Sequence, residues 1–172
     1  PLNITPGKLF PGNVTEPGYG GEGNIHGAYP ELAKTIMEVV TATLDNSRAF
    51  AGQGPLSAYV LGDSISYGLR MAGFTSALQA KLGGKVKISH DAGRSITCPG
   101  TQIKKTGLQS LDIDREHIAH SKVISVVLGT NQTEASFSDS QQELMRKLKS
   151  IAPDARYFWV DIGATIASQA AG

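Results

Sequence analysis

Four short apolar runs recur along most of the chain. The stretches between them carry apolar residues at the spacing of helices. The runs fall at 58–61, 85–89, 123–128 and 156–162. The run at 123–128 is almost continuously apolar, which is typical of a parallel strand covered on both faces. Strands separated by helices imply a parallel sheet with right-handed crossovers. The pattern therefore predicts an α/β fold, a three-layer α/β/α sandwich around a mostly parallel sheet.

Apolar residues three and four positions apart predict the helices. They recur over 30–44, 69–82 and 138–151, and a shorter helix is expected within 112–120. The pair Gly83-Gly84 is expected to end the second helix. Ser138 or Asp139 is expected to cap the last one, and Pro153 to end it.

We find no internal repeat and no change in composition that would divide the chain. Its 172 residues are enough for one domain with a full core. A single domain over 1–172 is therefore expected. In it, 1–44 supplies a glycine-rich loop and a helix, 45–57 is a connector, and 58–172 carries the four strands.

Composition removes several classes of function. The net charge is only +1, so it indicates neither a nucleic acid nor an anionic membrane as partner. No apolar run approaches the roughly 20 residues of a membrane span. Cys98 is the one cysteine, which excludes an internal disulfide and a cysteine-rich zinc cluster. Neither a metal nor an organic cofactor is expected.

Residues suited to acyl transfer follow three of the predicted strands. Ser64 comes just after the first strand, at the start of a helix, where a hydroxyl can act as a nucleophile. Gly93 follows the second strand and lets a backbone N–H approach a ligand. Asn131 follows the third and offers an amide donor. The N–H groups of Ser64 and Gly93 and the side chain of Asn131 are expected to converge on one oxyanion.

A serine nucleophile also needs a base. His26 lies in a glycine-rich loop that runs into a helix, which suits a base presented at a crevice. His117 and His120 are expected on the surface, and His90 is interpreted as structural. Asp63 is expected to accept hydrogen bonds around the turn rather than to act as a catalytic acid.

Together these residues resemble the sequence blocks of the SGNH, or GDSL, hydrolase family. The matching residues are Gly62-Asp63-Ser64, Gly93, Gly129-Thr130-Asn131 and His26. The resemblance implies a flavodoxin-like hydrolase fold and a Ser-His acyl-enzyme mechanism without a cofactor. It also favours a secreted or periplasmic location.

Two features depart from the family pattern. The histidine block comes before the serine, whereas in the family it comes last; we therefore infer a circular permutation, natural or engineered. The family also has an aspartate three residues before the histidine, where this chain has Gly23. Glu22 is one candidate to orient His26. A backbone carbonyl, and hence a Ser-His dyad, is the other.

The resulting hypothesis is hydrolysis of short acyl esters, in particular O-acetyl groups on a carbohydrate. Ser64 is the nucleophile and His26 the base, while Tyr67, Arg94 and Tyr29 are candidates to line a polar substrate pocket. Two alternatives remain open. One is an O-acyltransferase that uses the same site, and the other is a glycan-binding module that has lost turnover.

Overall fold

A parallel sheet, with four strands among the described residues, forms the centre of this part of the molecule. The computed structural model describes residues 34, 36–38, 42, 54–131 and 134–160. The strands are β1 (Leu56–Gly62), β2 (Gly83–His90), β3 (Val123–Val127) and β4 (Arg156–Trp159). Their order is β2-β1-β3-β4, and every neighbouring pair is parallel. The predicted α/β class with a parallel sheet is confirmed.

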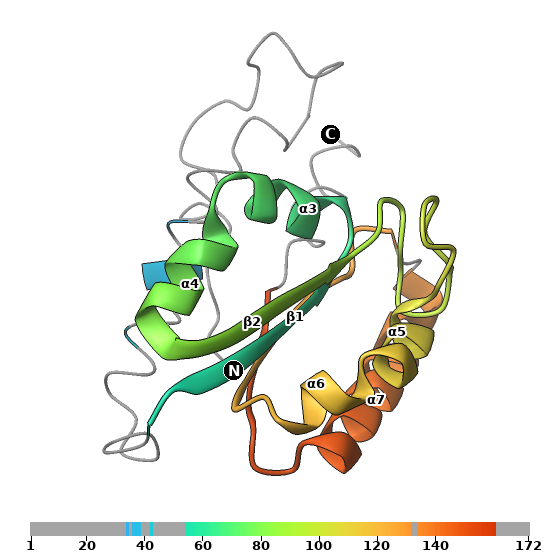
Figure 1. Cartoon of the computed structure of the whole chain (residues 1–172). Helices are drawn as coiled ribbons and strands as arrows, with labels where there is room; N and C mark the ends of the chain where they lie inside the picture. The colour runs from blue at the N-terminus through green and yellow to red at the C-terminus, as the bar shows by residue number, and fades with distance from the viewer. Residues whose placement is uncertain (1–33, 35, 39–41, 43–53, 132–133, 161–172) are drawn as a thin grey trace, which may run out of the picture.

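Helices cover both faces of this sheet (Figure 1). They are α3 (Ser64–Met71), α4 (Phe74–Leu82), α5 (Gly107–Ile113), α6 (Arg115–Ala119) and α7 (Glu134–Ile151). One face carries α3 and α4, while α5, α6 and α7 lie on the other. The described part of the chain thus has the three predicted layers.

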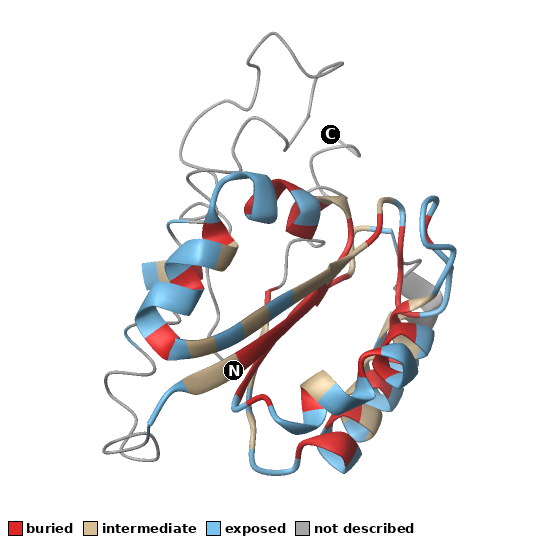
Figure 2. Cartoon of the chain, in the orientation of Figure 1, coloured by how far each residue is buried: buried red, intermediate tan, exposed pale blue. Residues whose placement is uncertain are grey.

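Alternation along β1 divides the core between the two faces. Ala58 and Val60 belong to the apolar cluster under α3 and α4, and Tyr59 and Leu61 belong to the cluster under α5 to α7. Successive strand residues point to opposite faces, so one buried strand supplies both clusters. Figure 2 shows β1 buried along most of its length between the two helical layers.

The predicted helix over 69–82 is wrong in its start and in its continuity. The structure forms two helices there, and the first, α3, begins at Ser64 behind the cap Asp63, five residues before the predicted start. Gly73 then interrupts the helix between α3 and α4, because its φ of 83° lies in the left-handed region. The expected end is confirmed, since Gly83 is the C-cap of α4.

Two other helix predictions have different outcomes. The short helix expected within 112–120 is confirmed as α6, while α5, which ends just before it, was not predicted. Helix α7 begins at Glu134, so the caps predicted at Ser138 and Asp139 are wrong. Its end at Ile151, before Pro153, is confirmed.

Only parts of two predicted elements lie within the described residues. In the helix predicted over 30–44, the described positions 34, 36–38 and 42 are all helical, and Ile36 joins the core beside α3 and α4. The strand predicted over 156–162 is observed as β4, and 161–162 lie outside the described residues. Within the described ranges, no helix is both long and apolar enough to cross a bilayer.

Candidate active site at the carboxyl ends of the strands

The centre of the sheet contains a topological switch point. The chain leaves β1 for β2 on one side and later returns to β3 on the other side. Open α/β sheets bind ligands beyond the carboxyl ends of the strands at such a point. Ser64 begins α3 directly after β1, and Asn131 lies four residues after β3. Sequence order and topology thus bring two of the predicted site segments to one edge.

Asp63 joins these two segments through hydrogen bonds. Its side chain is fully buried. Oδ1 accepts from the Ile65 N–H at 2.9 Å, which caps α3. Oδ2 accepts from the Thr130 hydroxyl at 2.6 Å and from the Asn131 amide at 3.1 Å. The expectation that Asp63 accepts hydrogen bonds around the turn is confirmed.

The amide of Asn131 also reaches the loop that follows β2. Its nitrogen donates to the Arg94 carbonyl oxygen at 3.1 Å, in addition to Asp63 Oδ2. One side chain therefore ties together the segments after β1, β2 and β3. Because both N–H groups of this amide have acceptors, Asn131 can donate to an oxyanion only by exchanging one of these bonds.

The environment of Asp63 acts on its ionisation in opposite directions. Burial raises the pKa of its carboxyl group above the ordinary value of 3.8. The hydrogen bonds from Thr130 and Ile65, and the charge of Arg94, lower the pKa and partly offset burial. The hydrogen bonds that Asp63 accepts from Ile65, Thr130 and Asn131 favour the ionised form. Since Thr130 and Asn131 lie in the loop after β3, a carboxylate at position 63 depends on that loop.

Gly93 combines an exposed position with a left-handed backbone. It is exposed, and its φ of 74° is one that side-chain-bearing residues rarely adopt. A Cβ there would lie 3.6 Å from the Thr101 methyl carbon and would meet nothing closer. Among the described residues we find no acceptor for the Gly93 N–H. Within the described ranges, this donor is therefore unoccupied.

Arg94 lies elsewhere than expected for a residue that lines a substrate pocket. Its side chain is fully buried. The guanidinium donates to the carbonyl oxygens of Gly62 and Ser89 and to the Ser89 hydroxyl, at 3.2–3.4 Å. Burial lowers the pKa of Arg94, and the nearby Asp91 opposes that effect. The side chain braces the carboxyl ends of β1 and β2 from within, and we do not include it among substrate contacts.

The remaining candidates divide into two groups. Ser64 is half-buried, and Tyr67 is 46% exposed one turn further along α3. His26, Glu22 and Tyr29 lie outside the described residues. The interpretation of the sequence gave Thr130 no role of its own, although this residue lies between Gly129 and Asn131 in the block that carried the resemblance.

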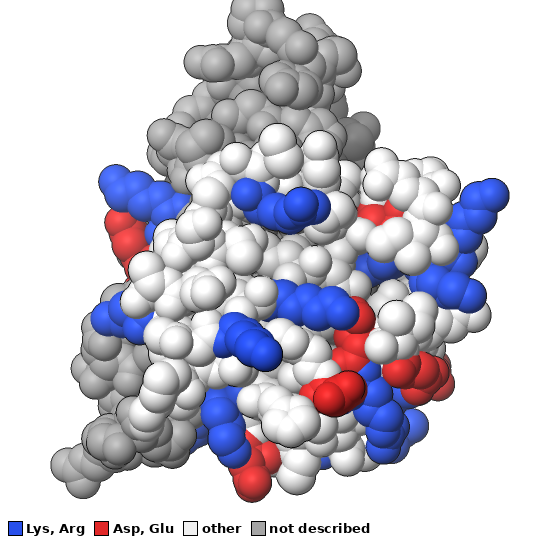
Figure 3. Space-filling model, in the orientation of Figure 1, with Lys and Arg blue, Asp and Glu red and all other residues white. Residues whose placement is uncertain are grey.

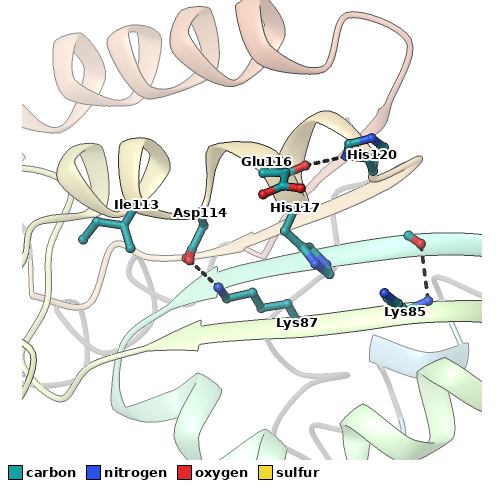
Figure 4. Close-up of a pocket in the computed structure, with 8 residues that line it drawn as sticks. Lys85, Lys87, Ile113, Asp114, Glu116, His117 and His120 are labelled. Atoms are coloured by element: carbon teal, nitrogen blue, oxygen red, sulfur yellow. Dashed lines mark hydrogen bonds and ion pairs between the residues drawn. The ribbon is translucent and has the colours of Figure 1, made fainter.

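A cleft of about 450 Å³ opens far from this edge, beside the starts of β1 and β2 and against α6 (Figure 4). It is lined by Ser57, Lys85, Lys87, Ile113, Asp114, Glu116, His117 and His120. His117 is half-buried here, whereas the sequence places it on the surface; exposed His120 agrees with that expectation.

The polar groups of this cleft mostly bind each other. Lys87 Nζ lies 2.5 Å from the Asp114 carboxylate, which also accepts from the Tyr59 hydroxyl. His117 Nε2 donates to the Ala58 carbonyl oxygen at 3.0 Å, because a carbonyl can only accept. We find no hydrogen bond from Ser57 to His117, and the described residues contain no group of three potential metal ligands. The cleft is thus a weaker candidate for catalysis than the strand ends.

The sequence matches no family model and no curated protein. Among solved structures, the chain is similar to the periplasmic domain of a lipopolysaccharide acetyltransferase from Salmonella ser. Paratyphi A, with a TM-score of 0.43 and 16% sequence identity. The matched region covers 80% of this chain and 57% of that one. The chain thus spans little more than half the length of that domain.

Proposed function

We propose that the protein is a serine esterase that hydrolyses short acyl esters, in particular O-acetyl groups on a carbohydrate. The observation that carries this proposal is the hydrogen-bonded group of Asp63, Thr130 and Asn131. It joins three strand ends at the switch point, next to a serine that opens a helix. Acyl transfer requires donors held in place beside the nucleophile, and these hydrogen bonds tie together the segments that carry the assigned donors.

In the proposed mechanism, Ser64 Oγ attacks the acyl carbon while His26 takes its proton. The C–O bond to the sugar then breaks, and the leaving alkoxide receives the proton from His26. Water attacks the acyl-enzyme, again with His26 as base, and releases the acid and free Ser64. His26 precedes Ser64 in the chain, so this mechanism includes the circular permutation inferred above.

The oxyanion of each tetrahedral intermediate is assigned to three donors. The N–H groups of Ser64 and Gly93 supply two of them. Asn131 supplies the third when its bond to the Arg94 carbonyl is exchanged for one to the substrate. Removing one donor of this kind typically costs about 100- to 1,000-fold in turnover. Glu22 or a backbone carbonyl orients His26.

Hydrolysis of p-nitrophenyl acetate tests the proposal. The comparison uses wild-type protein, Ser64→Ala, His26→Ala and, as a control, Ser76→Ala, which changes an exposed serine of α4. We expect activity in the wild type and the control and a loss of more than about 1,000-fold in the two site variants. Activity that survives in Ser64→Ala would contradict the nucleophile. Activity that survives in His26→Ala alone would contradict the base and the permuted order.

The same assay separates hydrolysis from transfer to a sugar. In an acyltransferase, a sugar hydroxyl replaces water in the second step, so added acceptor diverts the acyl group from acetate to an acetylated sugar. We expect acetate release to stay unchanged when glucose is added in excess over substrate, because water is then the acceptor that the acyl-enzyme uses. A folded wild-type chain without turnover would instead favour the glycan-binding module.

A further inference from the structure

Three side chains form a contact beside Ser64 that the proposed mechanism does not use. Arg70 NH1 lies 3.1 Å from His90 Nε2. The ring centroids of Tyr67 and His90 are 5.2 Å apart, and the rings are tilted by 59°. Because a guanidinium can only donate, His90 Nε2 accepts this hydrogen bond. The ring is therefore neutral, with its proton on Nδ1, and it holds the guanidinium in one direction.

Helix spacing and strand register place this contact near the proposed nucleophile. Tyr67 follows Ser64 by three positions, which places both residues on one face of α3. His90 ends β2 and is paired with Gly62, two residues before Ser64. The exposed side chain of Tyr67 thus lies one helical turn from Ser64.

Arg70 has no acidic partner within the described residues. Of the two buried acids nearby, Asp91 accepts hydrogen bonds from three loop N–H groups, those of Gln102, Ile103 and Lys104. The other, Asp63, binds the donors described above. On the face seen in Figure 3, the surface over α3 carries basic atoms without acidic atoms beside them.

The ionisation of His90 agrees with a positive local potential. Burial lowers the pKa of His90 most, and the charges of Arg70 and Arg94 lower it further. Asp91 is the one charge that opposes them. An anion brought to this place would relieve the unbalanced positive charge.

We propose that Arg70, Tyr67 and His90 form a subsite for a sugar that carries an anionic group, a carboxylate or a phosphate. Arg70 binds the anion, His90 positions Arg70, and the exposed ring of Tyr67 packs against the apolar face of the sugar. The subsite rests on the proposed function, because it defines which sugar esters Ser64 meets. A cation in the last turn of a helix also stabilises that helix, and this simpler role predicts no preference among ligands.

Binding tests the subsite without turnover. Full-length protein is titrated with glucuronate, glucose 6-phosphate and glucose at 0.15 M salt, roughly physiological ionic strength, and followed by backbone amide NMR. We expect both anionic sugars to bind at least about tenfold more tightly than glucose, with shifts in α3 and at the end of β2. Arg70→Gln removes this difference, and Arg70→Lys keeps part of it.

The control variant is Arg146→Gln, which changes an exposed arginine of α7 on the opposite face of the sheet. It keeps the preference for anionic sugars if the subsite exists. Equal binding of the three sugars, or a preference that survives in Arg70→Gln, overturns the subsite. Preference for one anion alone identifies whether carboxylate or phosphate is the ligand group.

Turnover separates the two proposals. We expect kcat/KM for acetylated glucuronate to exceed that for acetylated glucose by about tenfold in the wild type, and the ratio to fall to about one in Arg70→Gln. Turnover of both esters at the same rate by the wild type contradicts the subsite and leaves the esterase intact. Binding of the anionic sugars without any ester turnover contradicts the esterase and leaves the subsite intact.

Discussion

The Thr130 hydroxyl donates a hydrogen bond of 2.6 Å to Asp63 Oδ2, although the two residues lie 67 positions apart in the chain. Asp63 caps the helix that Ser64 begins, and Thr130 follows the neighbouring strand. The position of Ser64 thus depends on a loop from a distant part of the sequence. This dependence makes Asp63 a positioning residue for the proposed site.

Replacing Asp63 by Asn is expected to damage both stability and activity. An asparagine can still accept from Ile65, but its NH₂ group would face the NH₂ group of Asn131. Buried donors without acceptors cost about 1–3 kcal/mol each, so we expect a loss of about 2–3 kcal/mol in the free energy of unfolding. Urea denaturation measures this loss, and p-nitrophenyl acetate hydrolysis should fall by about 100-fold if the edge is disturbed.

The matched control is Asp112→Asn, which also removes one carboxylate. Asp112 is exposed and pairs with Lys147 at 2.7 Å. Exposed pairs contribute about 1 kcal/mol or less, so this variant should remain close to the wild type in both assays. Equal effects of the two substitutions would show that Asp63 has no special place in the site.

Gly93 and Gly73 allow backbone strain to be separated from catalysis. Both have a positive φ, 74° and 83°, and neither added Cβ would meet an atom closer than 3.6 Å. Each Gly→Ala change should therefore lower the free energy of unfolding by a similar amount, about 1–2 kcal/mol. Only Gly93→Ala should also lower kcat/KM, since its Cβ stands beside the N–H assigned to the oxyanion. Equal turnover in the two variants would argue against that assignment.

The contact between His90 and Arg70 predicts a dependence of stability on pH. The pKa of His90 is held below its ordinary value of 6.5, mainly by burial. The unfolded chain therefore binds this proton at a higher pH than the folded protein does. The stabilising contribution is fully present above about pH 6.5 and is lost as the pH falls through the lower folded value.

His90→Gln should weaken this dependence, because a glutamine oxygen can accept from Arg70 and does not titrate. Between pH 7 and pH 5, the Tm of the wild type should fall further than that of the variant. His120→Gln, at an exposed histidine, should follow the wild type. The same fall in Tm for wild type and His90→Gln would show that His90 is not the group responsible.

Much of the fold was predictable, because the pairing of the strands in a parallel sheet followed from the local pattern of apolar residues. Apolar runs located all four strands, and their separation by helices predicted the parallel sheet. Helix starts were less predictable. Asp63 sets the start of α3 through a side-chain cap, and Gly73 sets the start of α4 through its left-handed φ. The spacing of apolar residues reveals neither of these effects.

For the candidate site, the sequence predicted the positions of residues at strand ends but not their contacts. Ser64, Gly93 and Asn131 follow the strands as expected, since glycines and polar residues punctuate each apolar run. The burial of Arg94 was not predictable, because it depends on carbonyl oxygens of Gly62 and Ser89 that only the folded sheet brings together. His26, Glu22 and Tyr29 stay predictions, as they lie outside the described residues.

Covalent labelling of Ser64 tests the central claim most directly. Wild-type protein, Ser64→Ala and Ser76→Ala are treated with a fluorophosphonate, which reacts with activated serines, and the modified peptide is identified by mass spectrometry. We predict one adduct on the peptide that contains Ser64 in the wild type and in Ser76→Ala, and no adduct in Ser64→Ala. An adduct that persists in Ser64→Ala, or a folded wild-type chain that does not react, would contradict the account.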